Sequence, residues 1–205
     1  MDYKRLAEIY GECWSGEAGE WNSSLSNKYL EYMITKFFEE NFTVKPNFDI
    51  LNIGIGAGYW DRYLSFKVPE GSLTSIDIDR ECADNLGLCL QNENNRERVT
   101  ILCDDAITYR FDKKYDVITM IGSAVDESGN AEAIIRNAVS CLKEDGALYL
   151  QMICDKEGND LKSIMDDLDA EIETEFSDDS YGIPCRYYKI KGHENKKETG
   201  KSCQT

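Results

Sequence analysis

Beyond Pro46, short apolar runs alternate with stretches of helical periodicity, and this alternation constrains the fold more than any other feature of the chain. The runs are almost continuously apolar, which is typical of parallel strands that are buried on both faces of a sheet. Strands are predicted at residues 48–53, 73–78, 99–103, 115–121 and 147–153, and helices at 59–67, 80–91, 131–143 and 160–168. The order predicts an α/β fold with a doubly wound, mostly parallel sheet.

Two flanking segments follow other rhythms. Before Pro46, apolar residues at helical spacing predict helices over residues 2–13 and 27–38, which we interpret as a helical cap or lid over residues 1–47. After Asp169, residues 171–176 and 186–190 alternate between polar and apolar, which predicts an antiparallel hairpin and brings the sheet to seven strands. We expect one domain over residues 1–191, with its core at 48–191, and a flexible tail at 192–205.

The net charge of the chain limits which binding partners are expected. The chain has 39 acidic and 23 basic residues, a formal net charge of -16. Such a field repels phosphate backbones and anionic lipid surfaces, so we expect neither a nucleic acid nor a membrane as partner. No stretch approaches the roughly 20 apolar residues of a membrane helix, and the first residues lack the apolar run of a signal peptide. These features predict a cytoplasmic protein.

Eight cysteines raise the question of zinc or disulfides. None of them forms a C-x-x-C pair, and His193 is the single histidine of the chain. We therefore predict no zinc site and interpret the cysteines as reduced structural thiols. Because His193 lies in a polar segment, a nucleophile activated by histidine is also disfavoured.

The motif with the clearest chemistry is a strand that enters a glycine-rich loop and then a helix, over residues 49–60. Gly54, Gly56 and Gly58 occupy alternate positions in this loop. Glycine is needed where a backbone turns tightly and where a cofactor lies against the main chain. The spacing differs from the G-x-G-x-x-G fingerprint of dinucleotide-binding folds. We therefore expect a cofactor site of another kind at the end of the first strand.

Over about residues 48–190 the chain resembles the class I S-adenosylmethionine-dependent methyltransferases, whose first motif runs acidic-x-Gly-x-Gly-x-Gly. The resemblance implies S-adenosylmethionine as cofactor and S-adenosylhomocysteine as product, with Gly54, Gly56 and Gly58 against the cofactor. Asn52 stands where the family has its acidic residue. An amide can still hydrogen-bond to the cofactor there, but it carries no charge to pair with the cofactor's amino group.

The next two motifs extend the resemblance. Asp77 ends the second strand, where a carboxylate can accept hydrogen bonds from two vicinal hydroxyls. The resemblance assigns it to the ribose and places Ile78 against the adenine, although a turn or cap role for Asp77 stays open. Asp79 is interpreted as the cap of the following helix. By the same resemblance, Asp105 accepts from the adenine amino group and the Ala106 backbone amide reaches a ring nitrogen.

The predicted fourth strand ends at Ile121. The resemblance implies that this end of the strand faces the reactive methyl group of the cofactor. Methyltransferases that act on adenine, cytosine or glutamine amides carry an Asn/Asp-Pro-Pro-aromatic motif here, which this chain lacks. The comparison favours a small-molecule acceptor methylated on oxygen or nitrogen. No Asp-Asn pair follows the fifth strand, so a catalytic metal ion is not expected. No catalytic residue is predicted.

Candidate acceptor contacts lie in the lid and after the fourth strand. Tyr10, Trp14 and Trp21 are candidate walls of the substrate pocket, and Asp126 is a candidate for holding an ammonium group or orienting a hydroxyl. Ordinary packing of the aromatic residues and a solvated Asp126 are the open alternatives.

Two rival functions follow from departures in the sequence. One rival is an aminopropyltransferase-like enzyme, because the acidic charge of the chain would suit polyamine substrates. The glycine loop of such enzymes usually carries an acidic residue near the position of Tyr59, and the loop of this chain does not. A catalytically silent S-adenosylmethionine-binding or interaction protein of the same fold is suggested by Asn52 and by the lack of an identifiable base.

Overall fold

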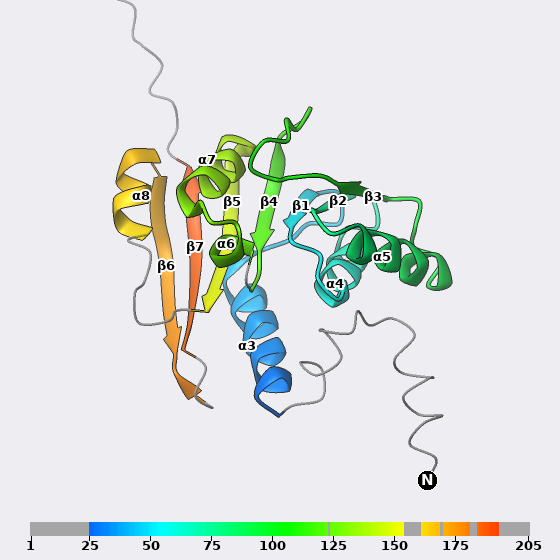
Figure 1. Cartoon of the computed structure of the whole chain (residues 1–205), viewed down its shortest axis with the longest axis horizontal. Coiled ribbons are helices and arrows are strands. Elements are labelled where there is room, and N and C mark those ends of the chain that lie inside the picture. The colour runs from blue at the N-terminus through cyan, green and yellow to red at the C-terminus, as the bar shows by residue number, and fades with distance from the viewer. Residues whose placement is uncertain (1–24, 123, 154–160, 169, 181–183, 193–205) are drawn as a thin grey trace, which may run out of the picture.

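A computed structural model describes residues 25–122, 124–153, 161–168, 170–180 and 184–192 (Figure 1). The helices are α3 (Leu25–Asn41), α4 (Tyr59–Lys67), α5 (Arg80–Asn92), α6 (Ala124–Glu127), α7 (Ala131–Ser140) and α8 (Leu161–Leu168). The strands are β1 (Asp49–Ile53), β2 (Ser72–Asp77), β3 (Val99–Cys103), β4 (Tyr115–Met120), β5 (Leu142–Ile153), β6 (Ala170–Asp178) and β7 (Cys185–Gly192). The candidate lid residues Tyr10, Trp14 and Trp21 lie outside the described residues. Of the predicted tail at 192–205, Gly192 instead ends β7, and residues 193–205 lie outside the described residues.

The strands form one seven-stranded sheet in the order β3-β2-β1-β4-β5-β7-β6. The first five strands in this order pair in parallel, and β7 pairs antiparallel with both β5 and β6. The predicted fold class, including the antiparallel hairpin, is therefore confirmed. Because the strand order reverses beside β1, ligand-binding loops are expected at the carboxyl ends of β1 and β4.

Helices cover both faces of the sheet, which gives the domain two apolar cores. One core packs α3, α4 and α5 against the sheet through side chains such as Phe38, Leu64 and Leu86. The other packs α6, α7 and α8 through side chains such as Ile135 and Met165. Each fully buried side chain of this size stabilises the fold by about 1.5–3 kcal/mol. The central strands are buried on both faces as a result, which explains their continuous apolar runs.

The helix α3 anchors the segment before the sheet. Its apolar stripe, which includes Ile34, Phe37 and Phe38, is buried against the sheet as the sequence periodicity predicts. The ring of Tyr149 on β5 stacks with Phe37 and Phe38, and its hydroxyl donates to the Ile34 carbonyl at 3.0 Å. The segment therefore packs directly on the core.

The predicted helix over 131–143 is too long and the predicted strand over 147–153 too short. The α7 helix ends at Ser140, where the Cys141 N–H donates to the Ala138 carbonyl. The Cys141 carbonyl in turn accepts from the Tyr115 N–H of β4 at 2.8 Å, so Leu142 pairs as strand instead of continuing the helix. Tertiary pairing with β4 overrides the local helical periodicity here. The short α6 helix was not predicted.

Two glycines outside the glycine-rich loop of residues 54–58 give a matched test of this packing. A Cβ at Gly71 would lie 2.0 Å from the backbone oxygen of Phe48, whereas a Cβ at Gly87 in α5 would make ordinary contact with Ile101. We expect Gly71→Ala to lower the free energy of unfolding by about 2 kcal/mol or more. Gly87→Ala should raise it by about 0.5–1 kcal/mol through higher helix propensity. Urea unfolding measures both, and equal effects would contradict the packing described.

Candidate functional site

The glycine loop between β1 and α4 depends on three left-handed backbone conformations. Gly54, Gly56 and Gly58 have φ angles of 88°, 53° and 76°, which side-chain-bearing residues rarely adopt. A Cβ at Gly54 would lie 3.1 Å from the Ala124 Cβ, and one at Gly58 would lie 3.2 Å from Leu86, but one at Gly56 would meet nothing within 4 Å. The backbone at Gly56 is therefore open to close approach by a ligand.

Asp77, at the end of β2, holds the glycine loop. Its Oδ2 accepts from the Ile55 N–H at 2.6 Å and the Gly56 N–H at 3.2 Å, and its Oδ1 accepts from the Asp79 N–H at 2.9 Å. A carboxylate has about four acceptor positions, so these bonds leave room for a further donor. The next residue, Ile78, has 76% of its surface exposed, which is unusual for so large an apolar side chain beside polar groups.

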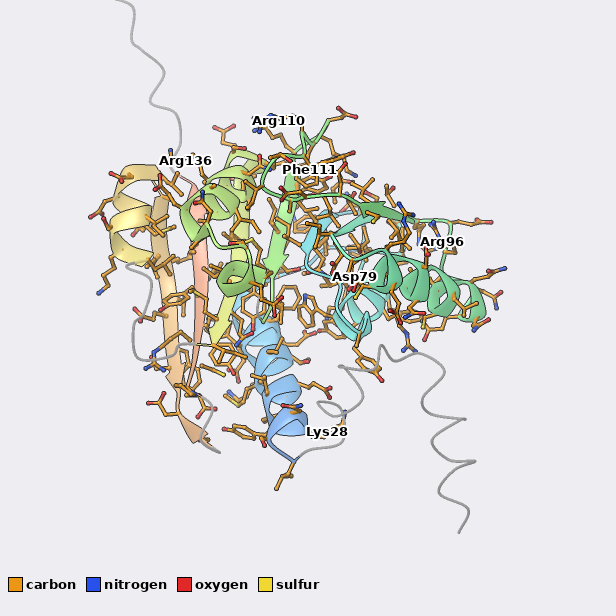
Figure 2. All side chains as sticks on the ribbon, viewed as in Figure 1. Lys28, Asp79, Arg96, Arg110, Phe111 and Arg136 are labelled. Atoms are coloured by element: carbon orange, nitrogen blue, oxygen red, sulfur yellow. The ribbon has the colours of Figure 1, made fainter. Side chains whose placement is uncertain are left out.

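Asp79 caps α5, as the sequence predicts. Its side chain accepts from the Glu81 N–H at 2.8 Å, and Figure 2 shows Asp79 at the start of this helix. Figure 2 also shows Arg110 and Phe111, just before β4, at the end of that strand opposite its carboxyl end. The glycine loop and Asp77 thus lie away from these residues.

The third predicted motif lies beside the second. Strands β2 and β3 pair with Asp77 opposite Cys103, and the Asp104 N–H donates to the Asp77 carbonyl at 2.9 Å. Asp105 is half-buried and its Oδ1 accepts from the Ile107 N–H, while the Ala106 carbonyl accepts from Asn137 of α7. Adjacent strands therefore bring the Asp105 motif to the same edge as Asp77.

Beyond β4 the chain turns at Gly122, which has a φ of 79°. The Gly122 N–H donates to Gln151 Oε1 at 2.7 Å, and Ile121 packs half-buried against the α3–α5 core. Gln151 is fully buried, and its Nε2 has no hydrogen-bond partner among the described residues. Sequence reasoning missed Gln151, although a polar residue within the apolar run of β5 was the available signal.

Four polar side chains form a row across the middle of the sheet. Ser75, Asn52, Thr119 and Tyr149 lie opposite one another on β2, β1, β4 and β5, and each is fully buried. Residues two positions further along a strand face the same side of a sheet. Those residues are Asp77, Gly54, Ile121 and Gln151. The row therefore lies directly beneath the groups that gather at the carboxyl edge.

Asn52 is the centre of this polar row. Its Nδ2 donates to the Gly54 carbonyl at 2.9 Å and to Asp61 Oδ1 at 2.8 Å, and its Oδ1 accepts from the Thr119 hydroxyl at 2.7 Å. Thr119 in turn accepts from the Trp60 indole at 3.1 Å. The structure thus places Asn52 beneath the glycine loop, where it fixes the loop backbone. Its predicted contact with a cofactor stays a prediction.

Asp61, in the first turn of α4, is fully buried beside Asn52. The pKa of its carboxyl is raised to about 6, mainly by burial. Hydrogen bonds from Ser75 and Asn52 oppose this rise, and the negative charge of Asp77 adds to it. Asp61 Oδ2 makes no hydrogen bond of ordinary geometry within the described part of the chain. Sequence reasoning missed Asp61 because an acidic residue near a helix start usually lies in solvent.

The remaining candidates are only partly placed. The backbone of Asp126 lies in α6, but its side chain is outside what the structure describes. Among the described residues, no group of three or more histidine, cysteine or acidic side chains is arranged to hold a metal ion. No helix of the described segments has the length and apolar character needed to cross a membrane.

Comparison with known proteins relates this fold and site to methyltransferases. A family model for a methyltransferase domain matches residues 50–146, which include the glycine loop, Asp77 and Asp105. The structure matches an N-methyltransferase, NodS from Bradyrhizobium japonicum WM9 in complex with S-adenosylhomocysteine, with a TM-score of 0.71. That match has 13% identity and covers 91% of this chain and 97% of the other. In fold and in the order of its motifs the chain resembles the class I methyltransferase family, whose model matches slightly less than half of its 205 residues. The cofactor of this family is S-adenosylmethionine.

The relatives of this chain differ in their acceptors. It is 25% identical over 126 residues to a malonyl-[acyl-carrier protein] O-methyltransferase of Priestia megaterium, a match that covers 61% of this chain and 42% of that protein. It is 28% identical over 149 residues to a fibrillarin-like rRNA/tRNA 2'-O-methyltransferase of Methanosarcina mazei, covering 70% of this chain and 74% of that protein. The chain thus spans less than half the length of the Priestia relative.

The buried carboxyl of Asp61 predicts a pH dependence of stability. Because its pKa in the folded protein is about 6, against 3.8 for an ordinary aspartate, the folded state binds more protons between pH 4 and 6. The free energy of unfolding should therefore fall as pH rises through this window. Asp61→Asn removes the titration, so we expect the variant to lose less stability from pH 4 to 6 than the parent does.

Urea unfolding at several pH values between 4 and 7 measures this difference. The control is Asp84→Asn, which removes an exposed carboxyl from α5 and should keep the parent's pH dependence. Although burial raises the pKa of Asp49, hydrogen bonds from Ser72, Lys113 and Lys143 lower it to about 2, so its contribution is lost mainly below pH 4. Identical slopes for Asp61→Asn and the parent would show that Asp61 does not titrate in this range.

Proposed function

We propose that this protein is an S-adenosylmethionine-dependent methyltransferase that transfers a methyl group to oxygen or nitrogen of a small molecule. The observation that carries the proposal is the convergence of three motifs at one edge of the sheet. The open backbone at Gly56, the Asp77 carboxylate and the Asp105–Ala106 turn come from three neighbouring strand ends. This edge is also where the strand order reverses, the usual ligand position in such sheets.

The cofactor-binding residues of the proposal fit the geometry of this edge. Gly56 leaves space for a ligand against the main chain, and Asp77 keeps acceptor capacity for ribose hydroxyls after bonding the loop. The exposed face of Ile78 offers an apolar platform for a flat ring. Asp105 and Ala106 lie beyond it at the end of β3. Their assigned contacts with the adenine extend the proposal.

The chemistry requires alignment more than proton transfer. S-adenosylmethionine, when bound, supplies a methyl group already activated by a positively charged sulfur. What this chain's residues contribute is orientation and exclusion of water, and such alignment by itself lowers a barrier by several kcal/mol. Ile121 and Gly122 close the end of β4, and the unpartnered Nε2 of buried Gln151 offers a donor there. We assign no catalytic base.

A small-molecule acceptor is the finer part of the proposal. The net charge of -16 opposes approach of a phosphate backbone, and no Pro-Pro pair follows β4. The relatives include O- and N-methyltransferases as well as an rRNA/tRNA 2'-O-methyltransferase. The charge argument therefore supports the small-molecule class, and a cytoplasmic location accords with it.

A catalytically silent relative is the second candidate, and one observation favours it. The uncharged Asn52 is fully buried and its amide is engaged by the loop and Asp61. A chain of this kind would bind the cofactor without turnover. Formation of S-adenosylhomocysteine in the presence of amines, phenols or carboxylic acids separates the two functions.

The Asp77 carboxylate provides the direct test of cofactor binding. We expect Asp77→Ala to weaken binding of S-adenosylhomocysteine by at least about tenfold, because charge-assisted hydrogen bonds to the loop and ligand are lost together. Calorimetric titration of the purified protein measures the affinity, with NAD as a ligand that should not bind. Asp84→Ala, on the exposed face of α5, is the matched control and should bind as the parent does. Unchanged affinity in Asp77→Ala would show that the ribose contact is misplaced.

A further inference from the structure

One buried ionisable group beneath the site has no part in the function proposed above. The carboxyl of Asp61 is fully buried, and the groups that lower its pKa are all neutral: Ser75, Asn52, which donates to Oδ1, and the backbone of Asp61 itself. A buried carboxylate that has only neutral partners destabilises a fold unless something else offsets its desolvation. A ligand of positive charge is one such compensation.

The position of Asp61 connects it to the glycine loop by a single side chain. Asn52 Nδ2 bonds both Asp61 Oδ1 and the Gly54 carbonyl, at 2.8 Å and 2.9 Å. Asp61 itself lies in the first turn of α4, directly after the loop. The carboxyl therefore lies behind the loop backbone rather than in the open site, where charge and loop geometry are its routes to a ligand that it does not contact.

The surroundings of Asp61 contain a second negative charge and no described cation that neutralises it. Asp77 on β2 is the charged group that acts on its carboxyl, and the groups from β1 and β2 beside it, Asn52 and Ser75, are neutral. Arg62, the neighbour on α4, is paired with Glu93. At pH 7 the pKa of about 6 leaves Asp61 mostly ionised, which gives the site a buried negative potential.

A negative potential acts differently on S-adenosylmethionine and on S-adenosylhomocysteine, because the two differ in charge. S-adenosylmethionine carries a sulfonium, and S-adenosylhomocysteine, which lacks the methyl group, has a neutral sulfur. On the cofactor assignment made under the proposed function, we propose that Asp61 is a positioning residue whose buried charge favours binding of S-adenosylmethionine over S-adenosylhomocysteine. Transfer of the methyl group removes the positive charge, so the same residue favours release of the product.

A purely structural role for Asp61 predicts a different result. If the carboxyl only fixed Asn52 and the loop, its replacement would weaken the two ligands equally, because they share every other group. The ratio of the two affinities therefore separates charge from geometry. Asp61→Asn suits this test because the amide keeps the shape and retains an oxygen to accept from Asn52.

The experiment is calorimetric titration of each variant with S-adenosylmethionine and with S-adenosylhomocysteine at pH 7. We expect Asp61→Asn to lower the affinity ratio, S-adenosylmethionine over S-adenosylhomocysteine, by about threefold to tenfold, because the variant removes a buried negative charge beneath the site. Asp84→Asn removes an exposed charge of the same sign from α5 and should leave the ratio unchanged. A ratio in Asp61→Asn equal to that of the parent overturns the proposal.

The unmodified protein provides a second measurement that does not depend on the folding of a variant. As pH falls from 7 to 5, Asp61 gains a proton and the ratio should fall, whereas in Asp61→Asn it should stay flat. A flat ratio in the parent overturns the inference. If the parent binds neither ligand, the proposed function itself fails, and if it binds both with a constant ratio, only the role of Asp61 fails.

Discussion

The site depends on the hydrogen bonds of one buried amide, that of Asn52. Because a buried polar group without partners costs about 1–3 kcal/mol, the amide must find donors and acceptors within the core. It finds them on the glycine loop, on α4 and on β4, through Gly54, Asp61 and Thr119. The same bonds that satisfy Asn52 therefore fix the loop backbone relative to two strands and a helix.

The sheet order explains why these contacts meet at one place. With β1 between β2 and β4, residues of all three strands lie opposite one another, and a polar row of Ser75, Asn52 and Thr119 forms beneath the carboxyl edge. Two residues further along the chain come Asp77, Gly54 and Ile121, which the site uses. Side chains two apart on a strand share a face, so the buried polar row lies directly beneath Asp77, Gly54 and Ile121.

Stability and function oppose each other at Asp61. A carboxyl that is fully buried among neutral groups lowers stability at neutral pH, as the direction of its pKa shift shows. The polar surroundings reduce this cost without removing it. The proposed function would give this charge a role, since S-adenosylmethionine carries a positively charged sulfur. Buried ionisable groups with shifted pKa values are more common at functional sites than in purely structural cores.

The sequence by itself determined the fold class, the seven strands and the order of the cofactor motifs, because apolar runs, glycine spacing and helix caps such as Asp79 are local signals. It misplaced the α7 boundary, where pairing between Tyr115 and Leu142 overrides helical periodicity. Only the tertiary structure decided the partners of Asn52, the burial of Asp61 and the bond from Gly122 to Gln151. These contacts join residues up to 67 positions apart, and no local pattern records which strands become neighbours.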